Sequence, residues 1–88
     1  MKISGILESP SIKILLFLYD KGEVRYSDLT ALIRSRGTLS ANLKDLDEDK
    51  LIERRVVTTK PIQAYYSLTE KGSEVAKRFN EIGKILSH

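Results

Sequence analysis

The segment from Thr38 to Lys44 combines small polar side chains with one cation. Its sequence, TLSANLK, carries hydroxyls at positions 38 and 40, an amide at 42 and an ammonium group at 44. Such groups can hydrogen-bond to phosphates and to the edges of nucleic-acid bases. A small residue among them, Ala41, would let a helix approach a base closely. The candidate contact residues of this segment are therefore Thr38, Ser40, Ala41, Asn42 and Lys44.

These residues lie on a predicted helix over 38–49. Leu39, Leu43 and Leu46 recur at helical spacing and predict a buried face, which leaves the polar residues around the N-terminal turn and the far side. The N-terminal residues of a helix in the major groove are the ones that contact base edges. Each polar residue taken singly is better explained as a helix cap or a solvated side chain than as a contact residue, so the prediction depends on their arrangement.

Basic residues flank this helix on both sides. Arg34 and Arg36 precede it in a turn that contains Gly37, where they could contact flanking phosphates, and Arg25 is a further candidate. The acidic run over 45–49 opposes such a role because it would repel phosphate. That run lies beyond the turn expected to read the groove, and it could point away from a bound duplex.

In the segment over 51–68 the side-chain pattern changes from helical spacing to an alternation that repeats every two residues. Two alternating runs surround the tip TTKP and predict a β-hairpin. Arg54 and Arg55 lie on its first strand, and because adjacent strand residues point to opposite faces, only one of them can face a ligand. Thr59 and Lys60 form a tip suited to the backbone or minor groove of a duplex. An ordinary solvated hairpin would have the same sequence features.

Residues typical of helix starts and ends predict the other helices of the chain. Ser9 and Pro10 begin a helix and Gly22 follows its end, whereas Ser27 and Thr69 are expected N-caps of two further helices. The order is helix, strand, helix, helix, hairpin, helix. It predicts a single α+β, mainly helical domain over 1–88, with the winged helix-turn-helix architecture. Its expected parts are helices over 9–21, 27–35 and 38–49, a wing over 51–68, and a C-terminal helix over 69–87.

The last helix carries the apolar stripe Val75, Phe79, Ile82 and Leu86. A stripe of this length could fold back on the first helix, or its distal half could pair with a second copy of the chain. A domain of 88 residues has a small core and often gains stability by association. We therefore expect a homodimer.

Composition excludes several classes of function. The chain has no cysteine, and its single histidine is the terminal His88, so neither a cysteine-ligated metal site nor a nucleophile–histidine arrangement within the fold is available. The acidic DLDEDK run lacks the pattern and glycine of a calcium loop. We expect no enzyme activity, cofactor or metal. With no secretory signal or bilayer-spanning run, we also expect a cytoplasmic protein without a membrane partner. A net charge of +3 and a pI of about 9.3 are compatible with a polyanionic partner.

Two motifs resemble those of a known superfamily. TLSANLKDLDEDKLIERR resembles the pattern T-x-S-x-x-L-x-x-L-x-x-x-x-L-I of prokaryotic winged-helix transcriptional regulators, and YYSLTEKG is similar to the end of the wing in the MarR, HxlR and PadR groups. The likeness runs from Ile12 to about Phe79. One departure is Lys50, which stands where many relatives have glycine, so the turn after the recognition helix is expected to be wound differently. The short chain is expected to leave no room for the separate ligand-binding regions of larger relatives.

Two hypotheses of different class remain. The leading one is a homodimeric, sequence-specific double-stranded DNA-binding regulator of transcription. The alternative is a winged-helix module that binds another protein, since the fold alone does not fix the function. The acidic end of the third helix and Tyr65 would then form part of the contact surface.

Overall fold

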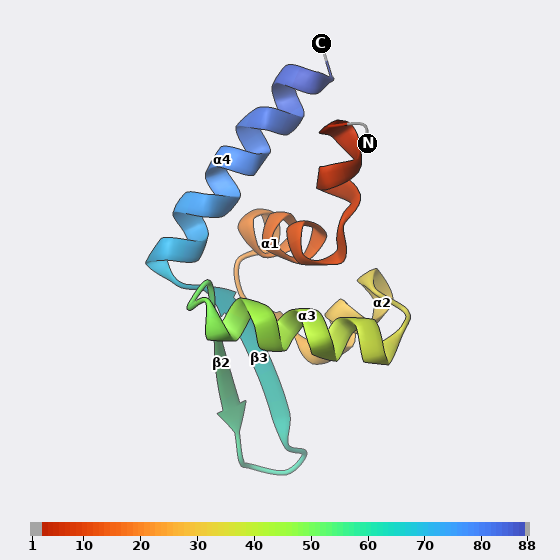
Figure 1. The fold of residues 1–88 in the computed structure, drawn as a ribbon. Helices are drawn as coiled ribbons and strands as arrows, with labels where there is room; N and C mark the ends of the chain where they lie inside the picture. Colours follow the sequence, from red (N-terminus) through yellow and green to blue (C-terminus); the bar gives the residue numbers. More distant parts are fainter. Residues whose placement is uncertain (1–2, 88) are drawn as a thin grey trace.

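The β-hairpin projects from one end of a small helical core, and the N-terminal and C-terminal helices project from the opposite end (Figure 1). The computed structural model describes residues 3–87. In chain order the elements are η1 (Ile3–Glu8), α1 (Pro10–Lys21), β1 (Val24–Arg25), α2 (Tyr26–Leu32), α3 (Arg36–Glu48), β2 (Ile52–Val57), β3 (Gln63–Leu68) and α4 (Glu70–Leu86). This is the mainly helical α+β, winged helix-turn-helix architecture that the sequence predicts.

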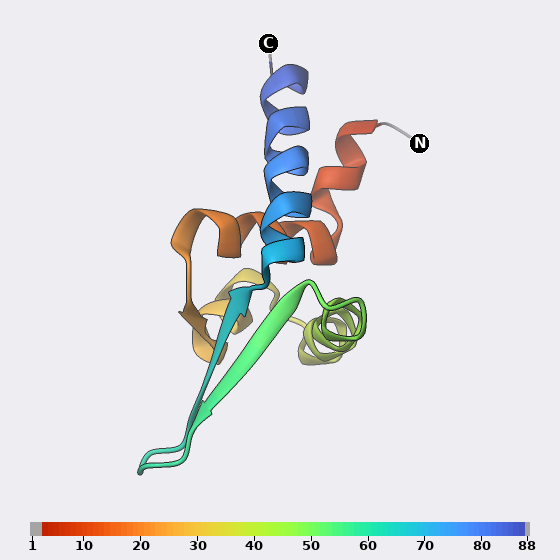
Figure 2. The same ribbon diagram turned by 90° about the vertical axis from the view of Figure 1, so that its left-hand side faces the viewer.

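The three strands form one antiparallel sheet in the order β1-β3-β2. Ile52 pairs with Leu68 and Val57 with Gln63, which leaves 58–62 as the hairpin tip within the predicted wing. Short β1 adds to the other side of β3 through Val24 and Tyr66. The strand pair extends well beyond the helices, at the end of the molecule opposite both termini (Figure 2).

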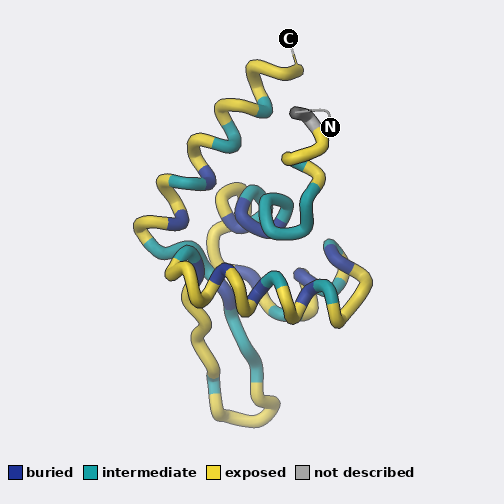
Figure 3. Tube along the Cα trace, in the orientation of Figure 1, coloured by how far each residue is buried: buried dark blue, intermediate teal, exposed yellow. Residues whose placement is uncertain are grey.

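The core lies where the helices meet the near end of the sheet (Figure 3). Each helix of the helix-turn-helix turns one apolar stripe inward, and the strands add side chains from one face. Burial of these side chains is the main stabilising contribution to a domain of this size. The fully buried large residues are Ile14, Leu15 and Leu18 of α1, Leu29 of α2 and Leu39 of α3.

The start and end of α2 differ from the prediction of 27–35. Arg25, not Ser27, occupies the N-cap position, because Asp28 accepts a hydrogen bond from the Arg25 backbone N–H at 3.0 Å. The helix ends at Leu32, where Ile33 adopts an extended conformation with φ −120°. Ile33 is buried in the core, so its packing stops the helix earlier than its sequence suggests.

Helix α3 begins at Arg36 rather than at the predicted Thr38. Ser35 is its N-cap, and the Ser35 hydroxyl accepts a hydrogen bond from the Thr38 N–H at 3.3 Å. Arg36 and Gly37, which we expected in a preceding turn, are therefore part of the first helical turn.

Helix α3 ends in a Schellman motif centred on Lys50. The Leu51 N–H donates to the Leu46 carbonyl at 2.9 Å, and the Lys50 N–H donates to the Asp47 carbonyl at 3.0 Å. Lys50 has a φ of 59°, the left-handed conformation that glycine adopts most easily. The expectation that lysine would wind this turn differently is therefore wrong: the chain keeps the conformation that a glycine would favour.

Replacing Lys50 by glycine is expected to stabilise the protein by about 0.5–1 kcal/mol, because relief of the left-handed strain exceeds the entropic cost of glycine. The free energy of unfolding from urea titrations would measure this change. Lys50→Ala is the control, since it removes the charge but keeps the Cβ atom. A loss of stability in Lys50→Gly, or an equal gain in both variants, would contradict this explanation.

Helix α4 is fixed to the end of α3 by several contacts around Thr69. The Thr69 N–H donates to the Leu51 carbonyl at 3.1 Å, and its hydroxyl donates to the Lys50 carbonyl at 2.7 Å and accepts from the Gly72 N–H at 2.9 Å. The Lys71 ammonium group donates to the Asp49 carbonyl at 3.0 Å. We call the contact of Thr69, Lys71 and Gly72 with 49–51 the junction. It sets the direction in which α4 leaves the sheet.

Candidate nucleic-acid interface

The first turns of α3 present an exposed polar surface. Ser40, Ala41 and Lys44 are exposed along with Arg36 and Gly37, whereas the leucines of the opposite face are buried. Thr38 is half-buried. In Figure 3 the outward side of α3 is largely exposed, and it lies in the same half of the molecule as the wing. The wing thus forms the end remote from the termini, and α3 crosses the molecule next to the base of the wing (Figure 1).

Asn42 is directed toward the molecule rather than outward. Its side-chain N–H donates to the Thr38 carbonyl at 2.7 Å, and its oxygen accepts a hydrogen bond from the Ser11 hydroxyl of α1. Asn42 is accordingly half-buried. These contacts link α3 to α1 and leave the amide poorly placed to reach a base edge, so we do not retain Asn42 among the candidate contact residues.

Arg54 lies on the side of the wing that faces α3. It pairs with Tyr66 across β2 and β3, and Tyr66 is buried on the core side of the sheet. Directly paired residues share a face. Arg54 therefore borders a hollow of about 260 Å³ between α3 and the wing, together with Leu43, Lys44, Asp47, Ile52 and Tyr66.

Arg55 points to the opposite face and is already paired. Its guanidinium binds both carboxylate oxygens of Glu23, at 2.8 and 3.3 Å, and lies 4.6 Å from the centre of the Tyr65 ring. The hydrogen bonds from Arg55 hold the pKa of the Glu23 carboxyl below its usual value. Of the two adjacent arginines, Arg54 is thus the one free to meet an anion near α3.

The other candidate cations surround α3 and the wing. Within residues 3–87, no ion pair involves Arg34, Arg36, Lys44, Arg54 or Lys60, and all five are exposed. Thr59 is exposed at the wing tip beside Lys60. The acidic run does not lie wholly away from the candidate interface. Asp47 borders the same hollow as Lys44 and Arg54. This carboxylate would limit non-specific attraction of phosphate to the site.

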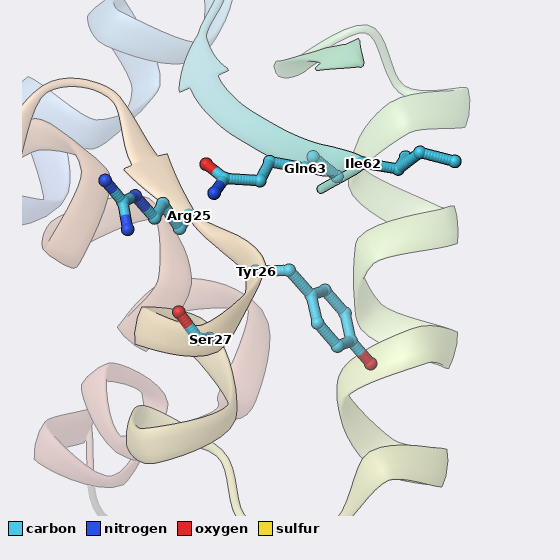
Figure 4. A pocket seen from close by; sticks show the side chains of 6 residues that line it. Arg25, Tyr26, Ser27, Ile62 and Gln63 are labelled. Carbon is cyan, nitrogen blue, oxygen red and sulfur yellow. The ribbon is translucent and has the colours of Figure 1, made fainter. Parts of the chain in front are cut away.

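A second hollow, of about 220 Å³, lies between the start of α2 and the wing. Arg25, Tyr26, Ser27, Ile62, Gln63 and Ala64 line it. Figure 4 shows the Ile62 and Tyr26 side chains extending toward the side where α3 lies, whereas the Gln63 side chain extends the other way. Sequence reasoning missed Ser27 and Ile62 as candidate contact residues, because nothing local indicates that α2 and the wing tip are neighbours.

The predicted association stripe of α4 divides into two parts. Val75 packs against the core of its own chain, and Phe79 is half-buried. Further along, Ile82 and Leu86 are 39% and 43% exposed, and Ile85, which lies beside the stripe, is 72% exposed. We call Ile82, Ile85 and Leu86 the distal patch. η1 packs against α4 near it, with a Leu7 methyl 3.5 Å from where a Cβ atom of residue 83 would lie.

The described residues offer neither a cluster of metal-binding side chains nor a membrane-spanning helix. No group of three or more histidine, aspartate or glutamate side chains in 3–87 is placed to hold a metal ion. Across the same residues, none of the helices has the length and apolar character needed to cross a bilayer.

Comparison with known proteins gives a consistent result. Residues 8–88 match the family described as HxlR-like helix-turn-helix. The chain is 32% identical over 85 residues to the uncharacterized HTH-type transcriptional regulator YvaP of Bacillus subtilis strain 168, covering 94% of this chain and 79% of that protein. It is 30% identical over 71 residues to the HTH-type transcriptional regulator YodB of the same strain, covering 78% of this chain and 63% of YodB.

A solved structure has the same fold. It is described as a MarR-family transcriptional regulator from Porphyromonas gingivalis W83. It aligns with a TM-score of 0.73 and 28% sequence identity, over 85% of this chain and 76% of that chain.

Proposed function

The chain belongs to the HxlR-like helix-turn-helix family of transcriptional regulators, and on this premise we propose that it binds specific sites on double-stranded DNA as a homodimer. The observation that supports the proposal is that the exposed outer side of α3 and the wing lie in the same half of the molecule, with cations on both elements that form no ion pair within residues 3–87. A helix of ordinary diameter fits the major groove, and an adjacent hairpin can reach the neighbouring minor groove or backbone.

The candidate residues divide by chemistry into two groups. Ser40 and Ala41, with Thr38 beside them, are proposed to face base edges in the major groove. The exposed cations, with Thr59, are proposed to contact phosphates, which position the protein but do not read sequence. That second group consists of Arg34 just before α3, Arg36 and Lys44 on α3, and Arg54, Thr59 and Lys60 on the wing.

Titration of a fluorescently labelled duplex, taken from a random pool by selection with this chain, tests the proposal. The affinity should fall steeply as salt rises, because neutralised phosphates release counterions. It should also exceed the affinity for a scrambled duplex of the same length. Failure of the selection to enrich any sequence, or equal binding to selected and scrambled duplexes, would contradict sequence-specific DNA binding.

We further propose that the distal patch pairs with the same patch of a second copy. A two-fold dimer joined at the ends of α4 would leave both wings free, and it would suit half-sites about 34 Å apart. Half-buried Phe79 would border such a contact, whereas Val75 serves the core.

Ile85→Lys tests this pairing. The variant is expected to sediment as a monomer at concentrations where the unchanged chain is a dimer, because it places a charge within an apolar contact. Lys84→Ala is a suitable control, since helical geometry directs residue 84 away from the patch. A monomeric unchanged chain, or a dimeric Ile85→Lys variant, would contradict this interface.

A further inference from the structure

Ile62 is the most exposed large apolar side chain of the wing, at 72%. It belongs to the hairpin tip and precedes β3, which begins at Gln63, so no strand pairing of the hairpin involves it. Ile62 also lies outside the core and outside the group of apolar side chains that pack on it. Its side chain thus contributes little to the folded chain and remains available for contact with a ligand.

The direction of Ile62 places it on the same side as Arg54. Figure 4 shows Ile62 extending toward the α3 side, opposite to Gln63. On the neighbouring strand, Val56 alternates in phase with Arg54 and is 41% exposed. The α3-facing side of the wing therefore carries an apolar strip, Val56 and Ile62, with Arg54 toward the core and Lys60 at the tip.

This order of charges and apolar groups is complementary to the minor groove of a duplex. Phosphates line both edges of that groove, and sugars and base edges form its walls and floor. Neither Arg54 nor Lys60 forms an ion pair within residues 3–87. Both cations can therefore meet phosphates, which would bring the apolar strip against the sugars and bases between them.

We propose that Ile62 enters the minor groove beside the major-groove site and makes the protein select against G·C pairs at that position. The inference rests on the proposed DNA binding and adds a second, separate source of sequence preference. In the minor groove a G·C pair differs from an A·T pair by the guanine N2 amino group. An isoleucine covering that group would remove it from water without supplying an acceptor, which is unfavourable.

Inosine provides the sharpest test, because an I·C pair lacks the N2 amino group but keeps the major-groove pattern of G·C. The selected duplex is prepared with G·C or with I·C at the positions that the wing protects from hydroxyl-radical cleavage. The unchanged chain is expected to bind the I·C duplex about fivefold more tightly. Ile62→Ala is expected to bind both duplexes equally. Lys60→Ala is expected to weaken binding to both duplexes alike and to preserve the ratio, because phosphate contacts are independent of sequence.

Each other result overturns the inference. An unchanged chain that binds G·C and I·C duplexes equally makes no minor-groove selection, and an Ile62→Ala variant that keeps the fivefold ratio assigns the selection to another residue. Loss of dimerisation in Ile62→Ala, measured by sedimentation, would show that Ile62 contacts a second copy instead. If selection enriches no duplex at all, the proposed DNA binding itself fails, and that outcome is distinguishable from the others.

Discussion

Gly72→Ala is expected to destabilise the chain by about 3 kcal/mol or more, an overpacking effect at the upper end of the usual range. A Cβ atom on residue 72 would lie 1.8 Å from the Leu51 carbonyl oxygen and 2.7 Å from its carbon. Both atoms belong to the backbone just before β2, so no rotation of a side chain can relieve the clash. Helix α4 would have to move away, which would break the Thr69 hydrogen bonds of the junction.

Thermal and urea unfolding measure this effect. Ser73→Ala is the matched control, because residue 73 is exposed one position further along the same helix, where we expect a change within about 0.5 kcal/mol. An unfolding midpoint for Gly72→Ala close to that of Ser73→Ala would mean that the junction is not packed as described. This close approach of α4 also gives a physical reason for glycine in the TEKG motif.

The double variant Lys44→Ala/Arg54→Ala is expected to bind the selected duplex about 30-fold or more weakly, since each cation supplies a charge-assisted contact. The two residues border the same hollow, one from α3 and one from β2. If α3 occupies the major groove and the wing the adjacent minor groove, the sugar–phosphate backbone between the grooves passes over this hollow. Loss of both contacts should also reduce the slope of log affinity against log salt by about 1.8.

A variant of equal charge separates this local effect from that of net charge. Lys77→Ala/Lys84→Ala also removes two positive charges, but both lie on α4, away from the wing. We expect only a small loss of affinity for this control. Equal losses in the two double variants would indicate general attraction of a basic protein to DNA, and would contradict the assignment of Lys44 and Arg54.

Features of the fold that depend on neighbouring residues could be predicted from the sequence. The alternation on both sides of TTKP predicted the hairpin, and Thr69 predicted the start of α4. Both signals are local, because the period of the side-chain pattern and the capping residue depend only on neighbouring residues. The start of α3 was misplaced although a local signal was present. Ser35 stands three residues before Thr38, which is the spacing of an N-cap and the N–H that it accepts.

The orientation of individual site residues could not be predicted, because it depends on distant partners. The Asn42 side chain is held inward by its hydrogen bond with Ser11, which is 31 residues away. Arg55, on the face of the wing opposite to α3, is held by Glu23, which is 32 residues away. Alternation indicated that only one of Arg54 and Arg55 could face a ligand. The burial of Tyr66, the partner of Arg54, shows which one it is.

We propose that the first turns of α3 and the wing act together on one face. Backbone amide chemical shifts, recorded while the selected duplex is added to the isotope-labelled chain, test it most directly. We predict perturbations over 36–44 in α3 and over 54–62 in the wing, with none at the exposed C-terminal end of α1 around Tyr19. Perturbations confined to α1 or α4, with α3 and the wing unaffected, would contradict the account.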